Sequence, residues 1–394
     1  MKIISINAGS SSLKFSLFEM NDESVIASGI FERIGNEIGS YTIKYSGQKI
    51  TQEMAFPTHT DAVNVLLEKL LALEIIRSYD DIKGVGHRIV HGGSKYSESV
   101  FITDQVMKDI EEFKVFAPLH NPAHLLGIAA FKAVLPDVPM VAIFDTAFHQ
   151  TMSEEAYLYP VPYSWYRDYG VRKYGAHGTS HRYITSCVKD LLKKEDFKLI
   201  SCHLGNGGSI TAIKNMKCVD TSMGFTPLAG IMMGTRSGDI DPSIIPYVME
   251  KEGKNAGEII DDLNTHSGLL GLSEYSNDMR DIVKQCEEGN KKAILAKNKF
   301  VRRVVDYISQ YYTLLEGCDV IVLTAGVGEN NSYIRKEILD KLTCLGVKID
   351  DSQNNICGDF VKLSTEDSKI DVYVIPTDEE LMIARDTLNL IKNR

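Results

Sequence analysis

Short apolar runs alternate along the chain with longer stretches in which apolar residues recur at the helical period of 3.6. Glycine or polar residues bound the apolar runs, as they do for buried strands. The clearest predicted strands are residues 3–6, 85–90, 138–144, 199–203, 320–324 and 372–375. Because helical patterns separate these strands, the sequence predicts an α/β fold.

Three helices have recognisable start signals or long periodic patterns. Asn121 followed by Pro122 indicates a cap with proline at the first helical position. Thr60 and Asp61 precede the periodic run 62–73, and another pattern extends over 290–315. We therefore expect helices to begin close to these three points.

Two segments of the chain are similar to each other. Residues 4–12 and 200–208 align without a gap, and each is an apolar strand that enters a turn of Gly, Ser and Asn. Alternating residues follow both turns, which predicts two β-hairpins. One hairpin in each half suggests a duplicated unit, although such short Gly/Ser matches also arise by chance.

The length of 394 residues exceeds the size at which one hydrophobic core keeps growing, which predicts two lobes. No flexible linker marks their boundary. We place it after Phe148, where the strand that ends before Asp145 gives way to a loop. The expected lobes are residues 1–148 and 149–379.

The composition, with 44% hydrophobic and 24% charged residues, is that of a soluble globular protein. No apolar run approaches the roughly 18 residues of a membrane helix, and the start of the chain lacks the pattern of a signal peptide. Seven cysteines without a CxxC or Cys/His cluster fit a reducing compartment. We expect a cytoplasmic protein without a membrane segment.

The formal net charge of -10 argues against a nucleic-acid partner, because such proteins carry a basic face for phosphates. An anionic substrate must therefore meet cations placed locally. Arg88 brings a guanidinium beside a strand and Arg236 lies in a glycine-flanked loop. Arginine grips carboxylate or phosphate with a planar fork, although a loop arginine is more often solvated.

The first hairpin has the residues of a phosphate-binding loop. Asn7, Ser10, Ser12 and Lys14 combine hydrogen-bonding groups with small neighbours that let a backbone approach phosphate. The spacing is not that of a Walker A loop, and an ordinary hairpin with a solvated lysine is the competing interpretation. The second hairpin, at 203–208, allows the same two interpretations.

The strand at 320–324 enters the sequence Gly326-Val327-Gly328, and a helix is predicted from about Ser332. A turn of this kind presents free helix amides to a nucleotide. The third glycine of the dinucleotide fingerprint is absent, so nicotinamide chemistry is disfavoured.

Carboxylates and histidines supply further candidates. Asp145 lies at the mouth of a strand, where it can hold magnesium through water, orient the attacking oxygen or simply cap a helix. Glu379 opens the last helix, where capping is the ordinary role. His120 and His177 have unusual surroundings, but single histidines are more often packed than catalytic.

Taken in order, these segments resemble the acetate kinase family along essentially the whole chain. The resemblance rests on NAGSSSLKF from Asn7, HRIVHGG from His87, APLHNP from Ala117, FDTAFHQTM from Phe144, YGAHGTSH from Tyr174, HLGNGGS from His203, DTSMGFTPLAGIMMGTRSGDIDP from Asp220, TAGVGEN from Thr324 and PTDEELMIARD from Pro376. It implies the duplicated two-lobed fold of sugar kinases, Hsp70 and actin, with a nucleotide cleft between the lobes. The last helix, 380–394, would return to the first lobe.

The resemblance also implies roles for individual residues. Arg88 would bind the substrate carboxylate, Arg236 and His177 would stabilise the phosphoryl group in flight, and Asp145 would be the essential carboxylate. Asn7 and Glu379 match the positions of the Mg²⁺ site, where Mn²⁺ can substitute. Residues matching ATP or ADP contacts are Lys14, Ser10, Ser12, His203, Leu204, Gly205, Asn206, Gly207, Asp278, Met279, Arg280, Gly326, Val327, Gly328, Glu329 and Asn330. The acid pocket would consist of Arg88, Val90, Leu119, His120, Ala176 and Pro227.

The reaction implied is direct in-line attack of acetate on the γ-phosphorus of ATP, which gives acetyl phosphate and ADP reversibly. An anionic carboxylate needs no general base, so alignment and charge neutralisation would supply the catalysis. A homodimer is the family's expected assembly.

Two positions depart from the family pattern: Ala176 stands where phenylalanine is usual, and Asp378 replaces a common asparagine. Ala176 leaves room for a longer acid, so propionate kinase is an alternative. A phosphohydrolase or a non-catalytic actin-like ATPase are more distant alternatives, which the contexts of Arg88, His177 and Arg236 disfavour.

Overall fold

The computed structural model describes residues 1–118 and 120–394. The chain forms two compact units: unit 1 contains Met1–Phe148 and Asp378–Arg394, and unit 2 contains His149–Thr377. Each unit has its own sheet and its own large apolar core.

Unit 1 is built on an eight-stranded sheet in the order β5-β4-β3-β2-β1-β6-β8-β7. The strands are β1 (Lys2–Gly9), β2 (Ser12–Glu19), β3 (Ser24–Glu32), β4 (Gly39–Tyr45), β5 (Gln48–Met54), β6 (Ile82–Ile89), β7 (Val100–Phe101) and β8 (Met140–Phe144). The first five form an antiparallel meander, while β1, β6 and β8 run parallel. The parallel strands place the ends of β6 and β8 at the same edge of the sheet.

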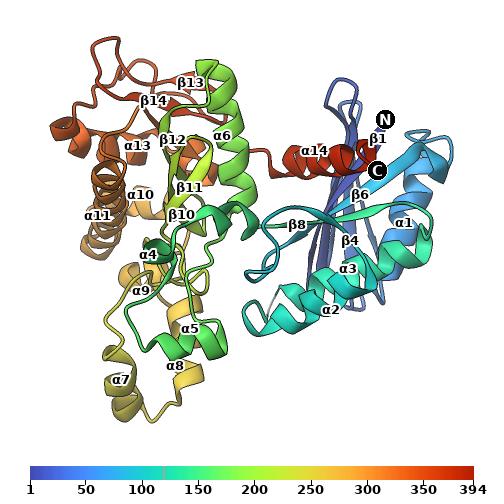
Figure 1. The fold of residues 1–394 in the computed structure, drawn as a ribbon, viewed down its shortest axis with the longest axis horizontal. Helices are drawn as coiled ribbons and strands as arrows, with labels where there is room; N and C mark the ends of the chain where they lie inside the picture. Colours follow the sequence, from blue (N-terminus) through green and yellow to red (C-terminus); the bar gives the residue numbers. More distant parts are fainter. Residues whose placement is uncertain (119) are drawn as a thin grey trace. The chain divides into compact units, whose positions relative to one another are not determined.

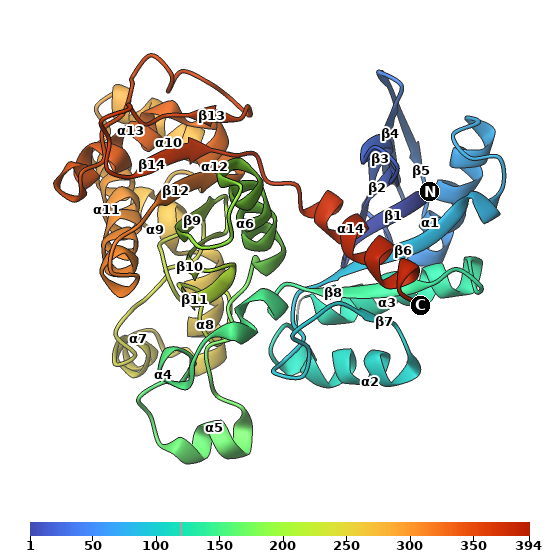
Figure 2. The ribbon, with the colours of Figure 1, turned by 45° about the horizontal axis from the view of Figure 1, so that its top comes forward.

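Helices cover both faces of this sheet (Figures 1 and 2). They are α1 (His59–Ala72), α2 (Asp104–Glu112), α3 (Asn121–Val134) and α14 (Glu379–Lys392). α3 and α14 lie on opposite faces of β1 and β6. Two glycines of β6 allow the close approach of α14, because an added Cβ at Gly84 or Gly86 would lie 2.4 Å from a side-chain atom of Ile391 or Thr387.

Unit 2 has a six-stranded sheet in the order β11-β10-β9-β12-β14-β13. Its strands are β9 (Lys198–Leu204), β10 (Gly208–Lys214), β11 (Lys217–Thr221), β12 (Val320–Thr324), β13 (Val361–Lys362) and β14 (Asp371–Val374). Its helices are α4 (Glu154–Tyr157), α5 (Tyr163–Tyr169), α6 (Gly178–Leu192), α7 (Ile244–Glu252), α8 (Ala256–Thr265), α9 (Gly268–Ser273), α10 (Met279–Glu287), α11 (Lys291–Leu314), α12 (Ala325–Asn330) and α13 (Ser332–Leu339). α6 and α11 pack on opposite faces of the sheet (Figure 1).

The two sheets share one topology over five strands. The order β3-β2-β1-β6-β8 in unit 1 matches β11-β10-β9-β12-β14 in unit 2, with the same strand directions. Both predicted hairpins are confirmed. The first turn has two residues between Gly9 and Ser12 and the second has three between Leu204 and Gly208, so the ungapped alignment holds only along β1 and β9. A repeated five-strand topology supports the duplication.

The predicted strands are all present, with ends that shift by one to a few residues, and β12 has the predicted bounds. The helix at 290–315 is confirmed as α11, whose first amides are capped by the Asn290 side chain. Helices also begin close to the other two predicted points, but different residues act as their caps. Thr58, not Thr60, caps α1 and forms a capping box with Asp61, and Asn121 is the first residue of α3, with Pro122 second.

The Asn121 side chain turns inward and donates hydrogen bonds to the carbonyls of His91 (3.0 Å) and Ile110 (3.2 Å). It therefore satisfies buried backbone groups in place of capping its own helix.

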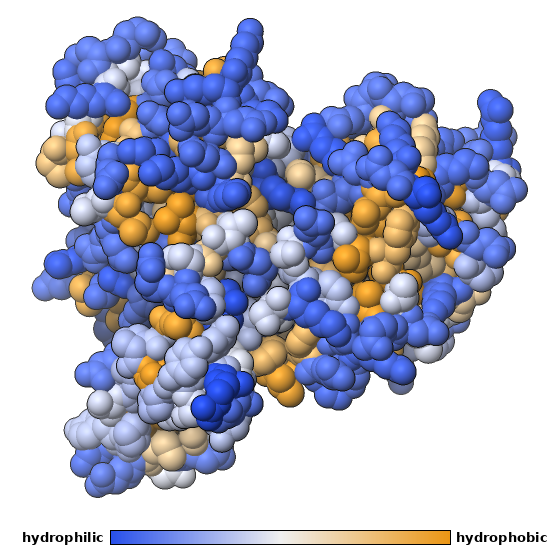
Figure 3. All heavy atoms as spheres, in the orientation of Figure 1, coloured by the Kyte–Doolittle hydropathy of each residue, from blue (hydrophilic) through white to orange (hydrophobic). Residues whose placement is uncertain are grey.

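No helix in the part of the chain that the structure describes is both long and apolar enough to cross a membrane. Hydrophilic side chains cover most of the face drawn in Figure 3, and the apolar ones lie in small groups.

Candidate active site

In unit 1, Arg88 and Asp145 meet where β6 and β8 end. Arg88 Nε donates to Asp145 Oδ2 at 2.9 Å, and Nη2 lies 2.7 Å from the same oxygen. The Asp145 side chain is 1% exposed and that of Arg88 is 19% exposed. Burial alone would lower the pKa of Arg88, but the carboxylates of Asp145 and Glu379 outweigh it and raise the pKa. The arginine thus stays charged and has a partly open guanidinium.

Glu379, the first residue of α14, lies close to this pair. Its Oε1 is buried without a hydrogen-bond partner among the described residues. Burial raises the pKa of Glu379, and the charge of Asp145 adds to this effect, whereas Arg88 opposes it. A buried carboxylate oxygen without a partner is a group that a bound cation would satisfy.

These two carboxylates fit a magnesium ion, since Mg²⁺ prefers oxygen ligands and is usually held by one or two carboxylates together with waters. No cluster of three or more His, Cys, Asp or Glu residues suited to a metal occurs in ranges 1–118 and 120–394. A site with few protein ligands is compatible with that finding.

The first hairpin carries the other predicted residues of unit 1. Asn7 and Lys14 are cross-strand partners, and the Lys14 ammonium forms an ion pair with Glu380 of α14. Ser10 lies in the turn and Ser12 begins β2. The expected phosphate lysine is therefore held by a carboxylate beside Glu379.

The residues predicted for the acid pocket are divided between the two units. In unit 1, Val90 follows β6 and is 8% exposed, and His120 precedes α3 as its N-cap. Leu119 lies outside the described residues. In unit 2, Ala176 is 5% exposed and its carbonyl accepts a hydrogen bond from His149 Nε2 at 2.8 Å.

Two cationic or ionisable groups of unit 2 converge on the turn between β9 and β10. A Cβ added to Gly207 would lie 3.5 Å from Arg236 Nη1 and 3.7 Å from His177 Nε2. Arg236 Nη1 donates to the carbonyl of Pro227 at 3.3 Å. Burial lowers the pKa of Arg236, and no carboxylate among the described residues opposes this effect. This arrangement suits a bound anion.

His177 has a strained backbone. It occupies the left-handed region, with φ +56°, at the N-cap of α6. A non-glycine residue in this region costs of order 1–3 kcal/mol and is kept where the surrounding structure determines it. The preceding Gly175 also has positive φ, and a Cβ there would lie 2.6 Å from the His149 ring. The backbone thus fixes where the imidazole lies.

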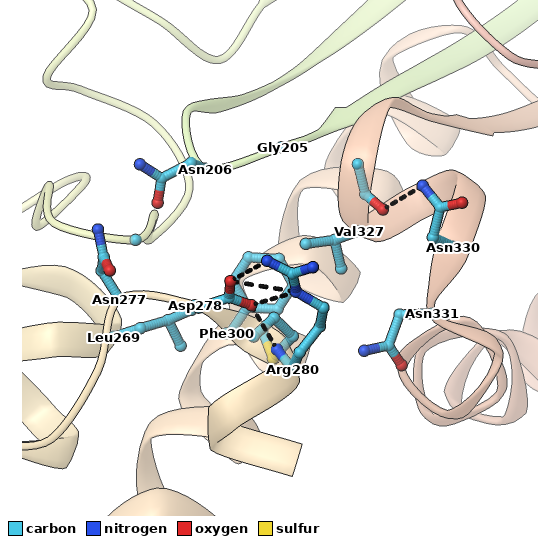
Figure 4. A pocket seen from close by; sticks show the side chains of 13 residues that line it. Gly205, Asn206, Leu269, Asn277, Asp278, Arg280, Phe300, Val327, Asn330 and Asn331 are labelled. Carbon is cyan, nitrogen blue, oxygen red and sulfur yellow. Dashed lines mark hydrogen bonds and ion pairs between the residues drawn. The ribbon is translucent and has the colours of Figure 1, made fainter. Parts of the chain in front are cut away.

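A pocket of about 510 Å³ begins at the same turn (Figure 4). Of the predicted nucleotide residues it is lined by Gly205, Asn206, Asp278, Met279, Arg280, Gly326, Val327 and Asn330, and further lining comes from Gly234, Leu269, Asn277, Phe300 and Asn331. Its size is that of a small-molecule site. His203, Leu204, Gly207, Gly328 and Glu329 are not among its lining residues.

Arg280 lines this pocket, and its guanidinium pairs with the carboxylate of Asp278 (Figure 4). Its Nε is 3.0 Å and 3.1 Å from the two carboxylate oxygens. The pKa of Asp278 is lowered by this hydrogen bond. Phe300 could not be found from local sequence, because it comes from α11, whereas Asn331 directly follows a predicted residue.

We expected a turn at Gly326-Val327-Gly328, but this segment is part of the short helix α12. The helix α13 begins at Ser332, as predicted. Glu329 Oε1 accepts hydrogen bonds from the amides of Ala325 (2.7 Å) and Thr377 (3.0 Å). The carboxylate therefore holds the start of α12 to the segment after β14. The fully buried Arg335 binds the carbonyls of Gly328 and Glu329.

Comparisons with known proteins agree along the whole chain. A family model described as the acetokinase family matches residues 2–385. An acetate kinase of Bacillus cytotoxicus is 54% identical over 99% of this chain and 98% of its own. A crystal structure of Porphyromonas gingivalis acetate kinase superposes with a TM-score of 0.95 at 42% identity, covering 99% of both chains. The crystal structure of a propionate kinase from Francisella tularensis superposes with a TM-score of 0.93 at 39% identity, covering 98% of this chain and 99% of the other.

Proposed function

Since this chain belongs to the acetokinase family, we propose that it transfers the γ-phosphoryl group of MgATP reversibly to acetate, giving acetyl phosphate and ADP. The observation that carries the proposal is the turn 205–207. One side of this turn lines a pocket of small-molecule size, and the other faces Arg236 and His177. A nucleotide base and ribose in the pocket would direct their phosphates toward the turn.

Arg236 and His177 are then the groups that neutralise charge on the migrating phosphoryl group. Gly207 has no side chain, which leaves space for the phosphates. A side chain at this position would lie against Arg236 and His177. Arg88 would hold the acid through its carboxylate, with Asp145 fixing the orientation of the guanidinium. The acid is already an anion, so orientation replaces general base catalysis.

Asp145 and Glu379, together with Asn7, would hold Mg²⁺, and Mn²⁺ would substitute for it. The ion supplies neutralisation of the phosphate charge when it is bound. The orphaned Oε1 of Glu379 supports this assignment. Lys14 would exchange Glu380 for phosphate, since their ion pair is partly exposed and weakly held.

A longer acid is the second candidate substrate, and Ala176 is the observation that favours it. One methylene in an apolar pocket changes discrimination by only about 1–3 kcal/mol. Propionate is therefore expected to be turned over beside acetate, and Ala176→Phe is expected to shift the ratio of kcat/KM values toward acetate.

The decisive test is a hydroxamate assay for acyl phosphate with MgATP and acetate, propionate or butyrate. Arg88→Ala and Asp145→Ala are expected to lower kcat/KM by roughly 100- to 1,000-fold, the cost of removing a group aimed at developing charge. Arg302→Ala, which removes a guanidinium that is 77% exposed, is the control and keeps full activity. Full turnover in both site variants, or ATP hydrolysis without an acid, would contradict the proposal.

We also propose a cytoplasmic homodimer. Seven free cysteines suit a reducing compartment. Apolar side chains are exposed on α5 (Tyr163, Trp165, Tyr169) and α7 (Ile244, Tyr247), the kind of surface that a second copy covers. Light scattering behind a sizing column is expected to give twice the mass of 43.9 kDa, and Trp165→Ser to shift the protein toward monomer.

A further inference from the structure

A continuous line of hydrogen bonds runs behind His177 into the interior of unit 2. His177 Nδ1 lies 2.9 Å from Ser209 Oγ, and Ser209 Oγ lies 2.8 Å from His181 Nε2. His181 Nδ1 in turn lies 2.9 Å from Ser201 Oγ. The three inner residues Ser209, His181 and Ser201 are all 0% exposed. Apolar side chains would fill this interior without needing hydrogen-bond partners, whereas each buried polar side chain must find one. A series of four polar side chains is therefore more than packing requires.

Regular secondary structure places these groups. His177 and His181 are one helical turn apart at the start of α6. Ser201 and Ser209 lie on β9 and β10, on the face that α6 covers, while their neighbours Cys202 and Ile210 belong to the apolar core on the other face. Rigid elements therefore hold the line, and no loop has to be ordered to form it.

The order of the protons along the line follows from its inner end. Within the described residues, Ser201 Oγ has no hydrogen-bond partner except His181. If His181 donated to Ser201, the Ser201 hydrogen would be buried without an acceptor, at a cost of about 1–3 kcal/mol. Ser201 therefore donates to His181 Nδ1.

The remaining protons are then determined. Because its Nδ1 accepts, the neutral His181 carries its proton on Nε2 and donates it to Ser209 Oγ. The Ser209 hydroxyl is left to donate to His177 Nδ1. His177 must consequently carry its own proton on Nε2, which lies near Gly207.

We propose that Ser209 and His181 are positioning residues, which fix the ring of His177 and hold it in the Nε2–H tautomer, so that a hydrogen-bond donor faces the migrating phosphoryl group. The proposal rests on the proposed function for the identity of the acceptor. A histidine in the other tautomer would present a lone pair to a phosphate oxygen, and would repel it.

The charges around the line agree with this order. Burial, with the neighbouring His149 and His203, lowers the pKa of His181 well below its usual value, so this ring is neutral. The His203 ring stacks on His177 with centroids 4.2 Å apart, and Arg236 lies across Gly207.

The first test is the tautomer itself, read from long-range ¹H–¹⁵N spectra of protein labelled at histidine, at about pH 8 where a histidine of ordinary pKa is neutral. The wild-type spectrum is expected to show His177 as the Nε2–H form. Ser209→Ala is expected to give a mixture of both tautomers. An Nδ1–H form in the wild type, or a spectrum that Ser209→Ala leaves unchanged, would overturn the proposal.

The second test is kinetic. Ser209→Ala is expected to lower kcat roughly 10- to 100-fold, as does loss of the partner that orients a working imidazole, and to leave the KM for ATP unchanged. In a His177→Ala background the same change should cost nothing further, because no ring is left to hold. A full additional loss in that background would show a merely structural role and refute the assignment.

Thr211→Val is the matched control. Thr211 lies two residues along β10 on the same face and is 0% exposed, and its hydroxyl lies 2.9 Å from that of Thr221. It should leave both kcat and the His177 spectrum unchanged. Ser209→Cys keeps a weak hydrogen-bond donor of similar shape, and it replaces Ser209→Ala as the test if the alanine variant folds poorly. Its kcat should lie below that of the wild type, by less than the loss expected for Ser209→Ala.

The two proposals fail in different ways. If no acid yields an acyl phosphate in the wild type, the proposed function fails, and the spectra alone still decide whether Ser209 and His181 set the tautomer. If acyl phosphate forms but the tautomer does not depend on Ser209, only the present inference is lost.

Discussion

At the scale of single residues, unit 1 keeps two imidazoles neutral by burying them. Burial, together with the neighbouring ring of His124, lowers the pKa of His87 to about 3. Burial and the charge of Arg88 lower the pKa of His124 to about 3 as well. His87 is 2% exposed, packs edge-on against Phe131 and has an Nε2 without a partner among the described residues. Neither ring can be protonated without a cost in stability.

Acid should therefore weaken unit 1. The folded pKa lies below the unfolded value of about 6.5, so the stability from these rings is complete above about pH 6.5 and is lost as the pH falls toward 3. Between about pH 7.5 and pH 5 the loss is of order 2 kcal/mol for each ring. In His87→Phe the free energy of unfolding should fall by about 2 kcal/mol less between these two pH values than in the wild type. Urea unfolding at both pH values measures this difference.

Val141→Ala, in the neighbouring strand β8, is the control for that measurement. It opens a cavity without removing a titratable group, so its cost should be the same at both pH values. An equal pH dependence in His87→Phe and the wild type would contradict the neutral buried ring.

At the scale of elements, the loop that carries Arg236 is closed by contacts of Gly238 and Asp239 with Gly230. Asp239 accepts from the Gly230 amide at 2.8 Å, and its other oxygen binds Arg303 and Tyr307 of α11. Gly238 has φ +71°, and a Cβ there would lie 2.5 Å from the Gly230 carbonyl oxygen. Only glycine fits this approach.

Gly238→Ala should consequently displace Arg236 and lower kcat by at least about 10-fold, since a shift of about 1 Å near the chemistry can cost 100-fold. Gly253→Ala is the control, because Gly253 has a similar φ of +69° but open space around it. That variant should lose only the about 1–2 kcal/mol of left-handed strain and remain active. Equal activity in the two variants would show that the loop tolerates the displacement.

Elements were predictable where their signal is local. β12 has its predicted bounds because four apolar residues and Thr324 stand between Asp319 and the small residues of α12. The start of α1 was misplaced although Thr58 and Asp61 have the spacing of a capping box, which was a readable signal.

Other features depend on partners far along the chain. Asn121 bonds to His91, and Glu329 bonds to Thr377, so no local pattern shows that these side chains face inward. Phe300 lines the pocket from a different helix for the same reason. The predicted site residues Arg88 and Asp145 do meet, and Arg236 and His177 both lie near Gly207, but their roles stay predictions.

At the scale of the whole molecule, unit 1 is completed by the last segment of the chain. α14 buries Leu381, Ile383, Ala384 and Leu388, and Ile383 packs with Val141 and Ile143 of β8. Full burial of one leucine or isoleucine side chain is worth about 1.5–3 kcal/mol, so the three larger side chains together are comparable to the stability of a domain.

A chain ending at Thr377 should therefore lose the fold of unit 1 and bind a dye for exposed apolar surface, while a chain ending at Lys392 should not. A peptide of residues 378–394 added to the shorter chain is expected to reverse the dye binding. A shorter chain that keeps the secondary structure of unit 1 without the peptide would refute the requirement for α14.

This discontinuity also has a consequence during translation. The sheet of unit 1 leaves the ribosome early, but its covering helix follows only after the about 230 residues of unit 2. At ~5–20 residues per second the delay is roughly 10–50 s, long compared with the folding of a small domain. For that time the nascent sheet presents an apolar face, which makes it a client for chaperones that act on the growing polypeptide.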